Sequence, residues 1–260
     1  MSATSAKEQR AKQREEAARE REQQERRKRV RRLAGAAAGL LAVVLAVILL
    51  AGGSDDGGGT PESVEGAAEI SRLLDGIPQD GLVLGDPGAP ATLVEFVDPQ
   101  CPYCADAARD VLPAIVNEEV RNGRLNLELQ VLTFIGPDSE KLGAFFAGAA
   151  LQDKAWHLSE VAFRNQGTEN TGWATDDVLE ALGGAVPGLD VAKAIDQGNS
   201  AAGQQLLARS RAAAQRSNVT STPSFLVRQG DALKRLELTE LTPDALRAAL
   251  RKAGVRGVAG

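Results

Sequence analysis

The feature that most constrains the fold is the position of the chain's two cysteines, Cys101 and Cys104. The segment before them, 91–97, is mostly apolar and rich in β-formers, which predicts a buried strand. The segment 102–120 has a helical pattern, with a kink expected at Pro113. The cysteines are therefore expected on the first turn of a helix that directly follows a strand.

The rest of the sequence predicts further strands and helices around this unit. We expect a helix to about residue 74, strands at 82–84, 125–134, 224–228 and 233–238, helices within 138–216, and a final helix ending near residue 252. The predicted order is β–α–β, a helical insertion, then β–β–α. This order indicates an α/β domain.

A cysteine pair at the start of a helix suggests thiol chemistry. The first cysteine lies over unpaired backbone N–H groups at the positive end of the helix dipole, which stabilise a thiolate. The thiolate is the nucleophilic form, and such a cysteine can have a pKa of roughly 3.5–7.5. The second cysteine can then attack a mixed disulfide and release the bound partner.

Other uses of the two cysteines fit the sequence less well. A structural zinc site needs about four ligands, and besides two cysteines the chain offers only His157 and carboxylates. A c-type haem would need a histidine after the second cysteine, but residue 105 is Ala. His157 lies in a predicted helix without an adjacent nucleophile, and we interpret it as a helix-face residue.

A 19-residue run without charges, 33–51, is long enough to cross the hydrocarbon core of a bilayer. A buried core helix would show polar interruptions, which this run lacks. A cleaved signal peptide is the stronger alternative. However, about thirty residues precede the run, and no A-x-A cleavage site or lipid-accepting cysteine follows it. We therefore predict an uncleaved transmembrane anchor.

The charges on either side of this run predict its orientation. Residues 1–32 carry 12 Lys/Arg and 6 Asp/Glu, whereas the rest of the chain carries 18 and 29. The positive-inside rule places 1–32 in the cytoplasm as a charged tail and the acidic part outside it. We expect a flexible linker at 52–62 and one domain at 63–260. An acidic domain offers no basic surface for nucleic acid.

Two motifs resemble DsbA-like proteins of the thioredoxin superfamily. The segment LVEFVDPQCPYC, 93–104, is similar to their active-site segment, and VTSTPSF, 219–225, resembles the strand opening at which they carry a cis proline. The resemblance covers roughly 76–253 and implies a thioredoxin fold with a large helical insertion. Segment 165–173 also resembles members of this family, and we interpret it as a loop joining helices.

The resemblance implies a role for each site residue. Cys101 resembles the attacking nucleophile and Cys104 the resolving thiol. Glu95 lies six residues before Cys101, where the family often has a buried acid that shuttles a proton. A structural carboxylate on the strand is the alternative interpretation of Glu95.

The substrate contacts are also implied by the resemblance. Pro223 is similar to the cis proline that lines the substrate groove, and the backbone of Thr222 would pair with an extended substrate. Pro102 and Tyr103, between the cysteines, are expected beside them. Well-known strong oxidants of the family have a histidine in this dipeptide, so Pro-Tyr leaves the redox potential open.

The first functional hypothesis is an extracytoplasmic disulfide oxidoreductase that acts as an oxidase on exported proteins. The resemblance implies a membrane redox partner of the DsbB or VKOR type, and the cysteine pair needs no cofactor. A reductase or isomerase of the same fold is the alternative in the same class. A binding module without turnover and a metallochaperone are the alternatives from other classes.

Overall fold

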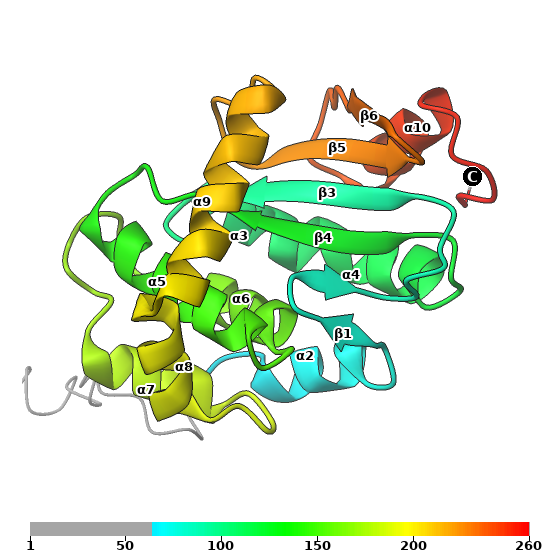
Figure 1. Ribbon diagram of the computed structural model, residues 1–260. Coiled ribbons are helices and arrows are strands. Elements are labelled where there is room, and N and C mark those ends of the chain that lie inside the picture. Colours follow the sequence, from blue (N-terminus) through cyan, green and yellow to red (C-terminus); the bar gives the residue numbers. More distant parts are fainter. Residues whose placement is uncertain (1–63, 260) are drawn as a thin grey trace, which may run out of the picture. The chain divides into compact units, whose positions relative to one another are not determined.

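A six-stranded mixed sheet forms the centre of residues 64–259, the part of the chain that the computed structural model describes (Figure 1). Its strands are β1 (Gln79–Asp80), β2 (Val83–Leu84), β3 (Thr92–Val97), β4 (Asn126–Val131), β5 (Ser224–Gln229) and β6 (Ala232–Arg235). They lie in the order β1-β2-β4-β3-β5-β6. Only β3 and β4 run parallel, and the other neighbours are antiparallel. The predicted β–α–β and β–β–α units are both present, with the helical insertion between them.

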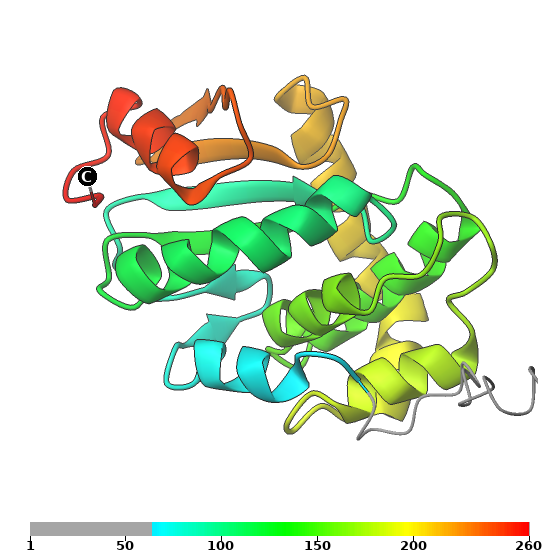
Figure 2. The same ribbon diagram turned by 180° about the vertical axis from the view of Figure 1, so that it is seen from behind.

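Helices cover both faces of this sheet. They are α2 (Ala67–Leu74), α3 (Pro102–Asp106), η2 (Ala107–Val111), α4 (Leu112–Ile115), η3 (Val116–Val120), α5 (Pro137–Ala150), α6 (Ala155–Arg164), α7 (Asp176–Gly184), α8 (Val191–Asn199), α9 (Ala201–Arg216) and α10 (Pro243–Lys252). The run from α3 to η3 and helix α10 lie on one face, seen from the front in Figure 2, and α9 crosses the other. The crossover from β3 to β4 is this helical run, as a parallel pair requires.

The two faces of β3 differ in what they carry. Val94 and Phe96 belong to a small apolar cluster on the α9 side, together with Ala214. The alternate residues Leu93 and Val97 belong to the main core, which also contains the cysteines. Since side chains alternate along a strand, Glu95 is directed to the same side as the cysteines. The core face of the central strand thus carries a carboxyl group.

The helix that begins after Cys101 is continuous from residue 102 to 120, as predicted, but irregular. Two π-helical turns, η2 and η3, lie on either side of the segment that contains Pro113. Proline has no N–H for the ladder, and π turns are a common way for a helix to accommodate such a residue. The irregularity expected at Pro113 is therefore spread over two neighbouring turns.

The insertion is held together by a close crossing of α5 and α8. A methyl group on Gly148 would overlap the Ala194 carbonyl, and one on Gly198 would overlap the Ala144 carbonyl. Only glycine permits two helix backbones to approach so closely. This contact joins α5 and α8 within the insertion.

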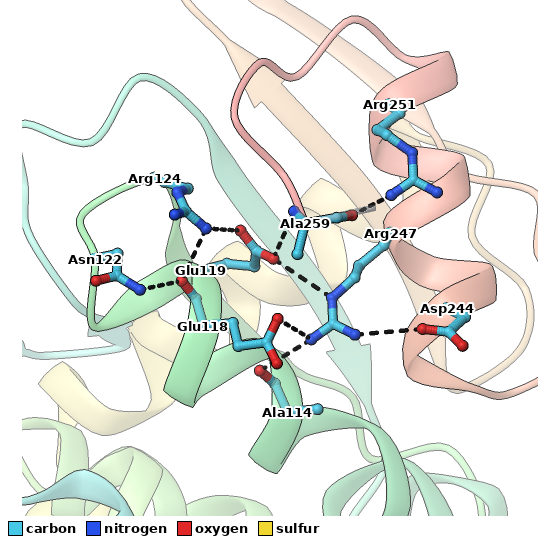
Figure 3. A network of polar contacts seen from close by, with 9 residues as sticks. All are labelled: Ala114, Glu118, Glu119, Asn122, Arg124, Asp244, Arg247, Arg251 and Ala259. Atoms are coloured by element: carbon cyan, nitrogen blue, oxygen red, sulfur yellow. Dashed lines mark hydrogen bonds and ion pairs between the residues drawn. The ribbon is translucent and has the colours of Figure 1, made fainter.

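At the far end of the sheet, Arg247 joins α10 to η3 (Figure 3). Its Nε lies 3.4 Å from Glu119 Oε1, and its Nη2 lies 3.0 Å from Glu118 Oε2. Glu119 also accepts hydrogen bonds from Arg124 Nη1 and the backbone N–H of Ala259. A buried carboxylate is thus surrounded by donors, which is the arrangement that makes its burial tolerable.

Several boundaries differ from the predictions. Strand β4 ends at Val131, and beyond it the N–H groups of Phe134 and Ile135 donate to the Asp98 side chain. The two-residue strand β1 was not expected from the sequence. Strand β6 begins at Ala232 and ends at Arg235, where 233–238 was predicted.

The predicted tail 1–32, anchor 33–51 and linker 52–62 all lie outside the described residues. Between residues 64 and 259, none of the helices combines the length and the apolar character needed to cross a membrane.

Candidate active site

The cysteine pair lies where β3 gives way to the helical run. Cys101 is the N-cap of α3, and Pro102 takes the first helical position, where the missing N–H costs no hydrogen bond. The N–H groups of Cys104 and Ala105 donate to the Cys101 carbonyl at 3.1 and 3.2 Å. Both cysteines are free thiols in this structure, and Cys104 is only 1% exposed.

The two thiols differ in acidity. A hydrogen bond from the Cys104 side chain, another from the Thr222 side chain, and nearby backbone N–H groups lower the pKa of Cys101 to about 6, against the opposing effect of burial. Burial raises the pKa of Cys104 well above its ordinary value, and its hydrogen bond to Cys101 acts in the same direction. One thiol is therefore ready to ionise near neutral pH, whereas the other retains its proton.

The segment before β5 completes the site from the other end of the chain. The peptide bond between Thr222 and Pro223 is cis, in agreement with the resemblance. The Cys101 thiol donates to the Thr222 carbonyl, with a sulfur–oxygen distance of 3.3 Å. The sequence motifs at 101–104 and 222–223 are thus brought into direct contact.

A cavity of about 340 Å³ opens beside this contact. Its lining combines the Tyr103 side chain, the cis-proline segment and the loop after β6. Those residues are Tyr103, Ser221, Thr222, Pro223, Ser224, Phe225 and the run 235–241. Tyr103 is 65% exposed, so an aromatic ring stands free at the edge of the cavity.

Glu95 lies beneath the cysteines in the core. It is 2% exposed, and its Oε2 atom has no hydrogen-bond partner. Burial, the charge of Glu160 and the charge of Cys101 raise the pKa of Glu95 well above its ordinary value. Glu95 in turn contributes to the raised pKa of Cys104. The acid that the sequence placed six residues before Cys101 therefore interacts electrostatically with both thiols.

The loop that presents the cysteines is fixed by buried polar contacts with the helical insertion. The Asp98 carboxylate accepts from the N–H of Gln100 and from the Ser139 hydroxyl. The Gln100 side chain donates to Ser139 at 3.0 Å and accepts from the backbone N–H of Asn170 at 2.7 Å. Asp98 and Gln100 belong to the loop, whereas Ser139 and Asn170 belong to the insertion, so the insertion positions the loop.

Gln166 makes the most direct contact of this kind. Its Nε2 donates to the carbonyls of Pro99 and Cys101, at 2.8 and 3.2 Å. Segment 165–173 was interpreted from the sequence as a loop joining helices, and the structure adds this contact with the backbone of Cys101. The family-like pattern of the segment was the available signal, but its partners lie more than 60 residues away.

Two further features concern other kinds of site. His157 is not beside the cysteines, and its Nδ1 lies 2.6 Å from Gln79 Nε2. Burial lowers the pKa of His157 to about 4, so it is neutral near pH 7.

Within residues 64–259, no three side chains of the His, Cys, Asp and Glu types are grouped so that they could hold a metal ion.

A model of a thioredoxin family matches residues 78–251. The chain belongs to this thioredoxin family. Two curated relatives share a shorter segment: a probable disulfide bond formation protein D of Bacillus cereus is 35% identical over 103 residues, and disulfide bond formation protein D of Bacillus subtilis is 30% identical over 103 residues. The match covers 38% of this chain in both cases, and 47% and 46% of the relatives. The chain thus spans about half the length of the curated relatives it matches.

Solved structures of the same fold cover more of the chain. Oxidised BdbD from Bacillus subtilis is similar with a TM-score of 0.57 and 21% identity, covering 68% of this chain and 96% of that one. DsbA from Chlamydia trachomatis is similar with a TM-score of 0.55 and 23% identity, and the match covers 68% of this chain and 93% of that one. A thioredoxin-like oxidoreductase from Silicibacter pomeroyi is similar with a TM-score of 0.52 and 25% identity, and the match covers 70% of this chain and 95% of that one. The DsbA-like fold expected from the sequence is confirmed.

Proposed function

We propose that this chain is a membrane-anchored protein disulfide oxidoreductase that transfers its Cys101–Cys104 disulfide to exported proteins. The observation that carries the proposal is the contrast between the two thiols. An acidic thiol next to the cis proline and a buried thiol that keeps its proton are the two unequal partners that disulfide exchange requires.

In the forward reaction, a substrate thiolate attacks the sulfur of Cys101 in the oxidised pair. The Cys101–Cys104 bond breaks, Cys104 leaves as a thiolate, and a mixed disulfide joins the substrate to Cys101. A second substrate thiolate then attacks the substrate sulfur of that bond and displaces Cys101. Two electrons pass from the substrate's dithiol to the enzyme's cysteine pair, and the substrate gains a disulfide.

The surrounding residues have defined roles in this scheme. Glu95, as a carboxylic acid, gives its proton to the Cys104 thiolate as that group leaves, and takes it back during reoxidation. Thr222 and Pro223 present backbone to an extended substrate beside Cys101. The exposed ring of Tyr103 supplies apolar contact at the entrance, next to Pro102.

The acidity of Cys101 favours the oxidising direction. A thiolate stabilised in the reduced enzyme makes reduction of the pair more favourable, and so makes the oxidised pair a stronger oxidant. An acidic thiol is also a good leaving group from the mixed disulfide. A reductase or isomerase would need a less stabilised thiolate, and a low measured potential would favour that alternative.

The setting of this reaction is part of the proposal. The apolar run 33–51 anchors the chain with residues 1–32 in the cytoplasm, and the domain from residue 63 onward acts outside it. There it meets exported substrates and is reoxidised by a membrane protein of the DsbB or VKOR type. The exchange itself needs only the cysteine pair.

The decisive measurement is the reduction potential of the cysteine pair in the full chain, held in detergent and equilibrated with glutathione buffers. A potential near the oxidising end of the range, about −120 mV, is expected of a disulfide donor. A potential near −270 mV would reverse the proposed direction.

Cysteine variants test the roles of the two thiols. Cys101→Ser is expected to abolish exchange with a reduced protein substrate. Cys104→Ala is expected to accumulate mixed disulfides, because the resolving thiol is missing. Normal turnover in Cys101→Ser would exclude the proposed mechanism.

A further inference from the structure

Arg235, the last residue of β6, lies at the cavity beside the cysteines, and the exchange scheme gives it no role. Among the described residues that line this cavity, it is the only one with a positive charge. Its side chain is 37% exposed. A charged residue on an edge strand often serves only to keep that edge from pairing with another chain. The contacts of Arg235 are more specific than that use requires.

Two nitrogens of the guanidinium hold the segment that contains Thr222. Nη1 donates to the Asn218 carbonyl and Nη2 donates to the Ser224 hydroxyl, each at 3.2 Å. The Ser224 hydroxyl in turn donates to the Ser221 carbonyl at 2.7 Å. These contacts fall on both sides of Thr222, whose carbonyl accepts from the Cys101 thiol. The guanidinium therefore supports the stretch of backbone that lies beside this thiol.

The third nitrogen faces the other segment that lines the cavity, the run 236–241. Nε of Arg235 lies 3.6 Å from Glu237 Oε1. The N–H of Leu236 donates to the Phe225 carbonyl at 2.9 Å, which continues the pairing with β5 past the end of β6. A guanidinium is a planar group with five donors in a fixed fork, so one residue can contact both segments. Arg235 thus joins the start of β5 to the run that follows β6.

We propose that Arg235 is a positioning residue for substrate binding, which holds the two lining segments, 221–225 and 236–241, at the spacing that an extended polypeptide needs beside Cys101. This inference rests on the proposed function, in which the backbone of Thr222 pairs with the substrate. A small dithiol such as dithiothreitol has no backbone to dock, so its reaction with the enzyme's disulfide does not use these segments. Arg235 is also not among the groups that act on the acidity of the Cys101 thiol.

The first test measures disulfide exchange by the full chain in detergent, in the wild type and in Arg235→Met. The oxidised enzyme reacts either with a short peptide that carries two reduced cysteines or with dithiothreitol, and free thiols are counted by alkylation and mass spectrometry. We expect kcat/KM for the peptide to fall about tenfold, mainly through KM, because contacts that shape the binding site are lost. The rate with dithiothreitol should not change. An unchanged value for the peptide, or an equal fall with both reductants, would overturn the proposal.

Two further variants test the contacts themselves. Arg235→Lys keeps the positive charge, but its single nitrogen cannot bridge both segments, so its KM for the peptide should be close to that of Arg235→Met. A wild-type KM in Arg235→Lys would show that charge alone is sufficient and would exclude the bridging role. Ser224→Ala removes one contact and should raise KM by less. If Arg235→Met does not fold, Ser224→Ala decides the proposal, and an unchanged KM there would overturn it.

Arg228→Met provides the control on the neighbouring strand. Arg228 pairs with Glu128 at 2.6 Å, and its side chain is exposed to a similar degree, 41%. It is not among the residues that line the cavity. Exchange with the peptide and with dithiothreitol should both stay at the wild-type rate. A raised KM in this variant as well would assign the effect to the loss of any arginine from this part of the sheet, and the specific role of Arg235 would be excluded.

Binding without turnover separates this proposal from the proposed function. A peptide with serines in place of both cysteines can dock but cannot react, and calorimetry measures its Kd. The Kd should be about tenfold higher for Arg235→Met than for the wild type. If the wild type exchanges no disulfides, the proposed function fails, whereas this Kd still decides whether Arg235 holds the cavity. If the wild type is active and Arg235→Met binds and reacts as the wild type does, only the role of Arg235 is excluded.

Discussion

Two regions of this molecule bury glutamates, and the regions differ in whether the carboxyl oxygens have hydrogen-bond partners. Around Glu119, both carboxylate oxygens accept hydrogen bonds, from Arg247, Arg124 and the backbone of Ala259 (Figure 3). Around Glu95 and Glu160, each acid has an oxygen without any partner. The first region compensates for burying a charge. The second leaves the acids uncompensated, which favours their neutral form.

The same residue type, glutamate, therefore has a structural part in one region and is suited to proton transfer in the other. Full pairing at Glu119 joins η3 to α10. Incomplete pairing at Glu95 and Glu160 costs stability but leaves protons that can move, and perturbed acids of this kind are concentrated at functional sites. Replacing single members of each region should therefore change stability in one and proton chemistry in the other.

The largest effect is expected from Arg247→Met. The substitution leaves Glu119 buried with fewer partners, and breaking a buried ion pair in this way costs about 3–5 kcal/mol. Denaturant unfolding at pH 7 would measure this loss. The pH midpoint for alkylation of Cys101 should stay at about 6, because Arg247 is not among the groups that act on that thiol.

Arg228→Met is the matched control for this change. Arg228 pairs with Glu128 at 2.6 Å, but its side chain is 41% exposed, so solvent screens the pair. A loss below about 1 kcal/mol is expected there. Equal losses in the two variants would mean that the Glu119 region contributes no more than a surface ion pair.

The next effect is the pH dependence of stability in Glu95→Gln. Because burial raises the pKa of Glu95, the folded state keeps a proton that the unfolded chain loses above about pH 4.3. This contribution to stability is complete below that pH and is lost as the pH rises towards the folded pKa, at up to about 1.4 kcal/mol per unit. Glutamine has no proton to lose.

Glu95→Gln should therefore become progressively more stable than the wild type as the pH rises from 5 to 8. Unfolding experiments at several pH values would show a difference that grows with pH. Glu119→Gln should instead be less stable than the wild type, because it removes the charge that faces Arg247. A constant difference between Glu95→Gln and the wild type would show that Glu95 ionises normally.

The sequence predicted the parts of this comparison that depend on local pattern. The family resemblance and the position six residues before Cys101 singled out Glu95, and the motifs at 101–104 and 222–223 predicted the contact between them. Glu160 could not be found in the same way. The segment 155–164 is an ordinary helix in sequence, and the burial of Glu160 depends on how α6 packs against the neighbouring helices.

Contacts between distant segments were missed for the same reason. The polar contacts of Asp98, Gln100, Ser139 and Asn170 join segments that are up to 70 residues apart, and each residue alone is typical of a turn or a helix start. The irregularity predicted at Pro113 is found in that part of the helix. The form it takes, two π turns, depends on packing that the sequence pattern does not contain.

A smaller effect is expected from Gln166→Met. This change removes the hydrogen bonds to the carbonyls of Pro99 and Cys101, at a cost of about 1–3 kcal/mol. Exchange should also become slower, because the loop that leads to Cys101 is less firmly held. Gln152→Met is the control, since Gln152 makes two hydrogen bonds to the backbone of Asp190 outside the site. It should lose stability with no change in exchange rate.

The smallest effect is expected from Thr222→Val, which removes one of the groups that stabilise the Cys101 thiolate. The hydroxyl is a smaller contributor than the Cys104 side chain, so the pKa of Cys101 should rise above 6, but by less than loss of the Cys104 side chain would raise it. The pH dependence of alkylation of the reduced protein measures this shift. Thr175→Val removes the side-chain cap of α7 and should cost about 1 kcal/mol without moving the midpoint. An unchanged midpoint in Thr222→Val would leave Cys104 and the backbone as the source of the low pKa, and would place thiolate stabilisation entirely within the cysteine helix.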